Sequence, residues 1–323
     1  MLHPSYDNSV VENVKNPFFQ IVPSLRSLRI CSCPSYKGVF CLYGKYDNYF
    51  KIILWNPSTR EVKAIPPPPS LPNYHLYQHS SSYLFLYCGF GGNPITNDLM
   101  IINLAIDDRG PRHDIYYSAE VYNLRTSSWT KICGPRHDFI VDHFTKPPRF
   151  HIIKTSTVLA NGICYWLLGE ETQQQKCILC FHFCNKRFSK LKLPKLPSIH
   201  LKHGFITDIN DSMAYVVGCK RSRGQIHIWT FEPDTNRWSK KYNFGPIDWR
   251  VLQWPFQMVT FSKDGAEFFA LAKYDGIWQM VSYNSHCMSI STFEFNLEGS
   301  CFLICYNRKY VESIVPLSFS SSR

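Results

Sequence analysis

Residues 52–62, which read IILWNPSTREV, decide the fold of this chain. A short apolar run ends at Trp55, turn-forming residues follow, and a second run includes Val62, seven positions after the tryptophan. Asn, Pro and Ser favour turns because they form local side chain–backbone hydrogen bonds or hold φ near the value that a turn needs. The stretch therefore predicts a β-hairpin.

The same spacing occurs five times along the chain. In each case an aromatic residue ends one run and a bulky apolar residue lies seven positions later in the next run. The five pairs are Trp55/Val62, Tyr122/Trp129, Phe181/Phe188, Phe231/Trp238 and Tyr283/Ile290. A further strand is expected upstream of each hairpin, at residues 38–43, 83–88, 162–168, 213–218 and 267–272.

The first members of these pairs lie on average 57 residues apart. That period, with three or four strands in each repeat, is close to the period of about 50 residues found in kelch proteins. We therefore predict an all-β chain folded as a β-propeller of about six kelch-like blades. Trp129 and Trp238 occupy equivalent positions in the repeat and are expected to be buried between blades. Residues 301–306 and 312–317 are expected to pair near residues 28–33 and close the ring.

The composition is that of a globular protein. The chain has 323 residues, of which 45% are hydrophobic and 18% are charged, so it can bury a substantial core. No run approaches the roughly 18 apolar residues of a membrane span, and the polar start of the chain does not have the pattern of a secretory signal. We expect no membrane association and a cytoplasmic or nuclear location.

The cysteines predict buried thiols. There are 13, an odd number, and many lie in apolar strand-like runs. The closest group is Cys177, Cys180 and Cys184, together with His182. In a strand, successive side chains point to opposite faces, so Cys177 and Cys180 would point apart. This pattern favours an ordinary buried strand over a zinc site, and no metal is expected.

No signature of an enzyme is present. The chain has neither a G-x-S-x-G elbow, nor H-E-x-x-H, nor a P-loop, nor a dinucleotide-binding fingerprint. Residues 89–92 read GFGG, but Asn93 and Pro94 follow them instead of a helix start, so a strand-ending loop is the favoured interpretation. We predict no catalytic residues, no cofactor and no enzymatic activity.

The order of the motifs resembles the plant F-box-associated domain, type 1, a family related to F-box/kelch-like and S-locus F-box-like proteins. The resemblance covers residues 30–317. It is carried by segments 53–61 (ILWNPSTRE), 119–124 (AEVYNL), 161–167 (NGICYWL), 226–229 (IHIW) and 310–315 (YVESIV). It implies a propeller that selects proteins for ubiquitination, preceded by an F-box that docks on a Skp adaptor in a cullin-based ligase.

The resemblance divides the chain into three parts: a short segment 1–29, the F-box-associated propeller 30–317 and a tail 318–323. Residues 1–29 are too short and too polar for a complete F-box. Binding to the Skp adaptor and the cullin scaffold is therefore expected only if this segment can dock.

Positive charge gathers in one part of the chain. The formal net charge is +11, and residues 186–241 contain twelve Lys or Arg against four acidic residues. Lys220, Arg221 and Arg223 lie between two expected strands and thus at a loop tip. A basic loop attracts acidic partners, although charge at hairpin tips also serves solubility. The basic hairpin turns need not share one rim with this loop.

The pentapeptide GPRHD occurs twice, at residues 110–114 and 134–138. Both copies flank the hairpin around Tyr122 and are expected to be neighbours. The alternatives are two solvated loops, which we favour, a recognition patch that includes Arg112 and Arg136, or a metal site. The residues of that metal site would be His113, Asp114, His137 and Asp138.

Taken together, the sequence predicts a protein-binding propeller that contacts its partner through Lys220, Arg221 and Arg223, with Arg112 and Arg136. The target protein is unknown, and an acidic protein is favoured over nucleic acid because no nucleic-acid motif is present. The alternative is a stand-alone propeller that binds an acidic partner or nucleic acid through basic rim loops.

Overall fold

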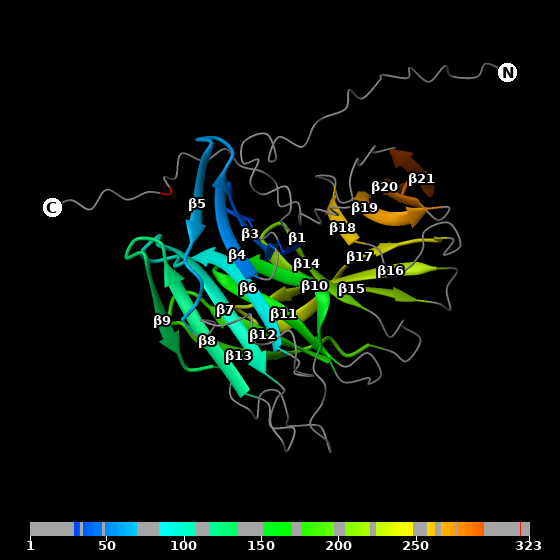
Figure 1. Ribbon diagram of the computed structural model, residues 1–323. Helices are drawn as coiled ribbons and strands as arrows, with labels where there is room; N and C mark the ends of the chain where they lie inside the picture. The colour runs from blue at the N-terminus through cyan, green and yellow to red at the C-terminus, as the bar shows by residue number, and fades with distance from the viewer. Residues whose placement is uncertain are drawn as a thin grey trace.

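Every regular element in the described part of the computed structural model is a β-strand (Figure 1). The structure describes residues 29–32, 35–46, 49–69, 84–107, 116–134, 151–169, 176–196, 204–219, 224–247, 257–261, 266–274, 277–293 and 317. Among these residues, no helix has the length and apolar character needed to cross a bilayer. The all-β prediction is confirmed.

The strands form five antiparallel sheets, which we call blades one to five in chain order. Blade one contains β1 (Arg29–Ser32), β2 (Ser35–Tyr36), β3 (Val39–Tyr46), β4 (Tyr49–Asn56) and β5 (Glu61–Ile65). Blade two contains β6 (Leu84–Gly92), β7 (Leu99–Asp107), β8 (Tyr116–Asn123) and β9 (Ser128–Ile132). Blade three contains β10 (His151–Ala160), β11 (Ile163–Gly169), β12 (Lys176–His182) and β13 (Arg187–Lys192).

Blades four and five repeat this order. Blade four contains β14 (Phe205–Ile209), β15 (Ser212–Cys219), β16 (Gln225–Glu232) and β17 (Arg237–Phe244). Blade five contains β18 (Gln257–Phe261), β19 (Glu267–Tyr274), β20 (Ile277–Asn284) and β21 (Ser289–Phe293). In blades two to five each strand pairs with the next one along the chain, as in a propeller blade.

The five predicted hairpins are present, and their register is the same in every blade. In every blade, the two residues seven positions apart face each other across the last two strands. The facing pairs are Trp55/Val62, Tyr122/Trp129, Phe181/Phe188, Phe231/Trp238 and Tyr283/Ile290. The constant spacing of seven residues therefore reflects the same turn geometry in all five blades.

The turns themselves show why the spacing is constant. The residue five positions after each aromatic residue has a positive φ, and the returning strand starts directly after it. These residues are Arg60 (φ 60°), Ser127 (φ 50°), Lys186 (φ 55°), Asn236 (φ 51°) and Met288 (φ 51°). In three turns an asparagine caps the bend: Oδ1 of Asn56, Asn123 and Asn284 accepts a hydrogen bond from the backbone N–H two residues later.

Blade two differs from the sequence prediction in one strand. The strand expected at residues 83–88 is present as β6, but β7, which was not predicted, lies between β6 and the hairpin. The predicted loop at residues 89–92 is also wrong, because these residues belong to β6 and face Leu99–Ile102 of β7. Glycine is required here by the neighbours: a Cβ on Gly89 would lie 2.5 Å from Sγ of Cys164, and one on Gly91 would lie 2.6 Å from the Phe183 ring.

The first strands of the blades lie around the centre of the ring. β10 contacts both β6 and β14, which come from the blades on either side. The inner strands of blades two to four are covered on both faces by the neighbouring blades, so they carry few polar residues. In blade three, Leu179 and Phe181 pack toward blade two, whereas Ile178 and Cys180 pack toward blade four.

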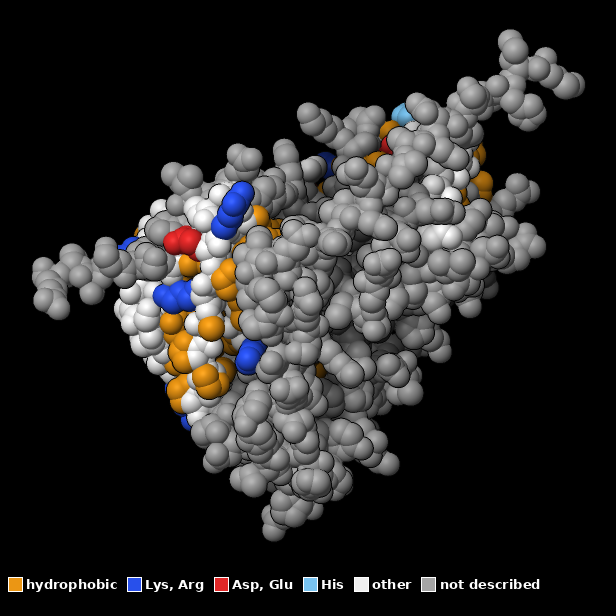
Figure 2. All heavy atoms as spheres, turned by 45° about the horizontal axis from the view of Figure 1, so that its top comes forward, with side chains coloured by type: hydrophobic (Ala, Val, Ile, Leu, Met, Phe, Trp, Pro, Cys, Tyr) orange, Lys and Arg blue, Asp and Glu red, His pale blue; other side chains and the backbone are white. Residues whose placement is uncertain are grey.

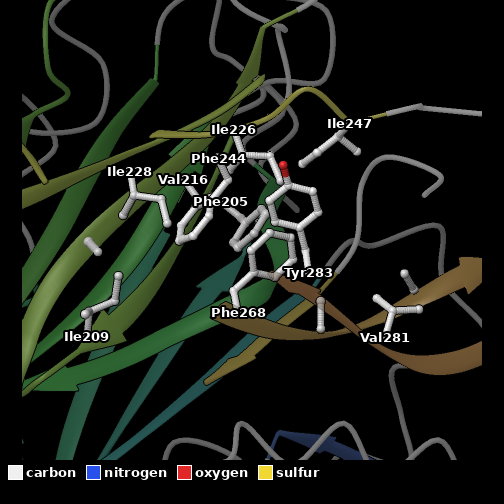
Figure 3. Close-up of a cluster of buried hydrophobic side chains, with 13 residues drawn as sticks. Phe205, Ile209, Val216, Ile226, Ile228, Phe244, Ile247, Phe268, Val281 and Tyr283 are labelled. Atoms are coloured by element: carbon white, nitrogen blue, oxygen red, sulfur yellow. The ribbon is translucent and has the colours of Figure 1, made fainter. Parts of the chain in front are cut away.

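Figure 3 shows the core between blades four and five. Phe244 of β17 contacts Phe268 of β19 edge to face at 5.1 Å between ring centroids, and Phe268 stacks on Tyr283 of β20 at 5.4 Å. Each buried aromatic side chain removes a large apolar area from water, so these residues contribute strongly to the stability of the core. Equivalent cores join blades one and two, two and three, and three and four.

The described residues form five blades, whereas about six were expected. The expected number was the chain length divided by the spacing of the hairpins. This division counted the chain ends and the long connections as if they formed blades. Each aromatic pair corresponds to one blade, so five pairs correspond to five blades. The propeller class is unchanged.

The end of the chain reaches back to blade one. The backbone N–H of Leu317 donates a hydrogen bond to Oε2 of Glu61 at 3.1 Å, and its side chain is buried in the core between blades one and two. Residues 301–306 and 312–316, which were expected to pair with the first strands, lie outside the described residues. Leu317 nevertheless joins the last part of the sequence to the first blade.

The equivalent tryptophans tie neighbouring blades together. The indole N–H of Trp129 donates to the backbone oxygen of Pro66 at 2.9 Å, and that of Trp238 donates to the backbone oxygen of Lys192, also at 2.9 Å. Both acceptors belong to the preceding blade or follow its last strand directly. The two rings are half-buried, which corrects the expectation of full burial.

This geometry predicts a graded loss of stability at Trp129. Trp129→Ala should lower the free energy of unfolding by about 2 kcal/mol, less than the 3 to 5 kcal/mol of a fully buried tryptophan. Trp129→Phe keeps a ring against Tyr122, whose centroid lies 5.2 Å away, and removes only the hydrogen bond, at a cost of about 1 kcal/mol. Urea denaturation measures both values; a phenylalanine variant as unstable as the alanine variant would contradict the packing role.

Candidate functional site

The residues predicted to contact a partner lie outside the described residues. This holds for Lys220, Arg221 and Arg223 between β15 and β16, and for Arg112 and Arg136 in the two GPRHD segments. Their role stays a prediction. The possible metal ligands of the duplicated pentapeptide, residues 113–114 and 137–138, also lie outside the described residues.

The described part of the basic region lies on the outermost strands of blades three and four, β13 and β17. The cations there are Lys186, Arg187, Lys190, Lys192, Lys195, Arg237, Lys240 and Lys241. All are exposed except Lys190, which is half-buried. Two acidic residues are also exposed, Glu232 at the end of β16 and Asp234 in the turn before β17, and Glu232 accepts a hydrogen bond from Ser239 at 2.8 Å. The excess of positive charge therefore covers the outer side of two blades.

The basic turns and the basic loop belong to opposite ends of the sheets. Lys186, Arg187 and Arg237 lie at the turns between the last two strands of their blades. Cys219 and Gln225, which flank the predicted loop, pair with each other at the other end of the β15–β16 ladder. The sequence left open whether these groups share one rim, and the topology separates them.

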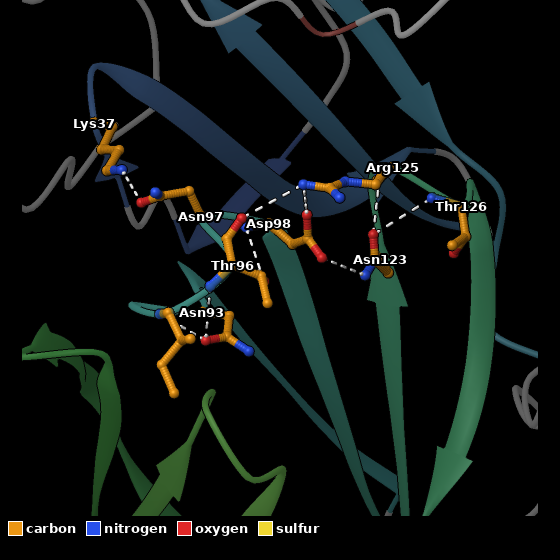
Figure 4. A network of polar contacts seen from close by, with 9 residues as sticks. Lys37, Asn93, Thr96, Asn97, Asp98, Asn123, Arg125 and Thr126 are labelled. Atoms are coloured by element: carbon orange, nitrogen blue, oxygen red, sulfur yellow. Dashed lines mark hydrogen bonds and ion pairs between the residues drawn. The ribbon is translucent and has the colours of Figure 1, made fainter. Parts of the chain in front are cut away.

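A second polar cluster joins the turns of blades one and two (Figure 4). Asp98 forms a salt bridge with Arg125 at 2.6 Å and also accepts a hydrogen bond from Asn123 at 3.4 Å. Lys37 donates to Oδ1 of Asn97 at 2.8 Å. Asn97 has a positive φ of 59°, which asparagine tolerates better than most residues. These bonds fix the loop between β6 and β7.

That loop presents an apolar residue to solvent. Ile95 is 80% exposed, and its backbone N–H is held by Oδ1 of Asn93 at 2.8 Å. Pro94 lies against Gly162 of blade three, where a Cβ on the glycine would be 3.2 Å away. The sequence analysis missed this cluster because Lys37, Asp98 and Arg125 are far apart in the chain and belong to no shared motif.

Burial disfavours the charged forms of several described side chains in blades three and four. Burial raises the pKa of the Cys180 thiol to about 12 and that of Tyr215 to about 12. Burial also raises the pKa of Cys177 and lowers the pKa of His182 below its usual range. A thiol with a raised pKa is a poor nucleophile at neutral pH, because the thiolate is the reactive form.

The cysteine strand has the predicted alternation. Cys177 lies against the core shared with blade two, and Cys180 lies in the core shared with blade four. His182 is bound to the Ser189 hydroxyl at 2.8 Å instead of to a cysteine. Within the described residues, no three His, Cys, Asp or Glu side chains form a group able to hold a metal ion.

Figure 2 shows a contrasting surface over the first two blades, in the coloured area at the left. Hydrophobic side chains are prominent there, with single cations and an acidic side chain between them. The described residues of β5 and β9 include Val62, which is 37% exposed, and the half-buried Trp129 and Ile132. The charge of blades three and four is therefore not a general property of the outer strands.

Comparisons with known proteins agree with this architecture. The chain matches the family described as the F-box associated beta propeller domain over residues 7–317. It is also similar to the F-box protein At3g22700 of Arabidopsis thaliana, with 24% identity over 183 residues. This match covers 55% of this chain and 48% of that protein. The chain thus spans about half the length of the curated relative that it matches.

Solved structures with similar chain paths are remote in sequence. Oligogalacturonate lyase from Vibrio parahaemolyticus is 9% identical with a TM-score of 0.46, covering 79% of this chain and 64% of that one. TolB from Acinetobacter baumannii is 10% identical with a TM-score of 0.31, covering 79% of this chain and 68% of that one.

Proposed function

The chain belongs to the family of F-box associated β-propeller domains, and on this premise we propose that it binds a target protein and presents it to an SCF-type ubiquitin ligase. In this proposal the propeller recognises the target and performs no chemistry. Its place of action is the cytoplasm or the nucleus.

The distribution of charge carries the target-binding part of the proposal. The inner strands of blades two to four are covered on both faces by neighbouring blades, so binding falls to turns, loops and outer strands. On blades three and four this outer surface is strongly basic. Positive charge speeds the encounter with an acidic protein and disfavours basic ones. An acidic target is therefore preferred.

The ligase part of the proposal has a direct test. The purified chain is incubated with a Skp adaptor and cullin scaffold, beside the same chain carrying an authentic F-box fused before Met1. We expect both to bind the adaptor. Binding by the fusion alone would overturn ligase docking by this chain and leave a binding module. Binding by neither would overturn docking as well, provided that an unrelated F-box protein binds in parallel.

A further inference from the structure

We propose that the seam between the outer strands of blades three and four binds an acidic polypeptide segment that carries an apolar side chain. We call this surface the basic seam and define it by Leu191, Leu193, Lys195, Trp229, Trp238 and Lys240. The inference rests on the proposed function, because it identifies the surface and the kind of target segment that the propeller recognises.

The floor of the basic seam is apolar and only partly covered. Trp229 and Trp238 of blade four, with Leu191 of β13 and Leu193 and Leu196 just beyond it, pack on the core between the two blades and remain half-buried. Trp238 is held in place from both sides, because its N–H binds the backbone of Lys192 and its ring lies 5.4 Å from that of Phe231. Partly exposed tryptophans on a rigid support are typical anchors of protein interfaces.

Two lysines lie beside this floor. Lys195 is exposed on the blade-three side between Leu193 and Leu196, and Lys240 is exposed on the blade-four side. Lys240 lies directly opposite Trp229 in the β16–β17 ladder and shares its face of the sheet. Neither lysine forms an ion pair with a described residue. Their charges are available to carboxylates of a partner.

The chain contains its own reference for this surface. The seam between blades one and two has the same geometry, because Trp129 binds Pro66 just as Trp238 binds Lys192. In both seams the residue whose backbone oxygen accepts the hydrogen bond lies four positions after the second residue of the last strand, Val62 or Phe188. The two seams can therefore be compared position by position.

The two seams have the same fold but different charges at equivalent positions. Three equivalent positions that border the basic seam carry cations: 187, 195 and 240. The matching residues at the first seam are Glu61, Pro69 and Lys131. One cation and one acid stand there in place of three cations. The propeller forms with either set, so folding alone does not require the cations of the basic seam.

The two seams also differ in the charge of the residue that faces the equivalent lysine, Lys131 or Lys240. Lys131 faces the buried Glu120 across the β8–β9 ladder, whereas Lys240 faces Trp229. A carboxylate within the blade accompanies the first lysine, and an aromatic ring accompanies the second. The basic seam thus lacks the internal acid of its counterpart.

An acidic protein segment fits this surface better than nucleic acid does. Proteins that bind single-stranded nucleic acid stack bases on free aromatic faces. Trp238 packs on Phe231 and is fixed by its hydrogen bond, and the leucines beside it suit an apolar side chain. Lys195 and Lys240 suit carboxylates on either side of such an anchor.

Peptide selection tests the proposal. A random library of displayed twelve-residue peptides is selected on the full chain, on Lys195→Glu/Lys240→Glu and on the matched control Lys63→Glu/Lys131→Glu. Both double variants change the net charge equally, and Lys131 is the structural equivalent of Lys240. We expect peptides from the full chain to be rich in Asp and Glu around an apolar residue. Their affinity should fall about tenfold or more in the seam variant and remain within about twofold in the control.

Three results would overturn the proposal: selected peptides without acidic enrichment, equal affinity for both double variants, or no selected peptide at all. Binding of a twenty-nucleotide DNA strand that depends on the basic seam, without peptide binding, would assign the seam to nucleic acid instead. Circular dichroism of the variants shows that each is folded. Failure here leaves the adaptor experiment unaffected, so loss of the seam assignment and loss of the proposed function are distinguishable.

Discussion

Trp166→Ala is expected to lower the free energy of unfolding by about 3 to 5 kcal/mol, the range for a buried tryptophan that leaves a cavity. Trp166 lies on β11 and is 0% exposed, in the core between blades two and three. A blade is held only by its neighbours, so a cavity at this position weakens the contact on which both blades depend. Urea denaturation of the purified variants measures the effect.

Trp166→Phe is the informative companion. The indole N–H of Trp166 has no hydrogen-bond partner among the described residues, so phenylalanine removes a buried polar atom and loses no bond. We expect it to cost less than half as much as alanine. If both variants were as stable as the wild type within about 1 kcal/mol, Trp166 would not be a core residue.

Gly89→Ala is expected to lower the free energy of unfolding by about 1 to 3 kcal/mol, as overpacking does in a close-packed core. The added Cβ would lie 2.5 Å from Sγ of Cys164 and 2.8 Å from Cγ2 of Ile102. Both neighbours are fully buried, so neither side chain can move into solvent.

A double-mutant cycle with Cys164→Ala tests the cause of this loss. Removing Sγ clears the closest contact, so the double variant should be more stable than the sum of the two single effects predicts. Purely additive losses would show that the close approach between blades two and three is not the source. Thermal denaturation provides a second measure of the same ranking.

The hairpins could be predicted from the sequence because their geometry is local. Trp55 and Val62 face each other through a turn of fixed length, and a residue with positive φ ends that turn in all five blades. The alternation of Cys177 and Cys180 is local for the same reason, since a strand alone places successive side chains on opposite faces.

The glycines of β6 show where local reasoning ended. Gly89 and Gly91 lie in a strand, and these positions require glycine because Cys164 and Phe183 of the next blade approach the backbone closely. Nothing near these glycines in the chain encodes that approach, so the sequence pattern favoured a loop. The number of blades likewise depends on how long the connections are, which the spacing of hairpins does not report.

For the candidate site, the sequence by itself determined the amount and the region of positive charge, because composition is a property of the chain. Only the tertiary structure decided that Lys195 and Lys240, 45 positions apart, flank one apolar floor. The reason is physical: Trp238 crosses from one blade to the next and binds the backbone of Lys192. Contacts between blades arise because one sheet packs on the next, and this packing joins residues that no local pattern relates.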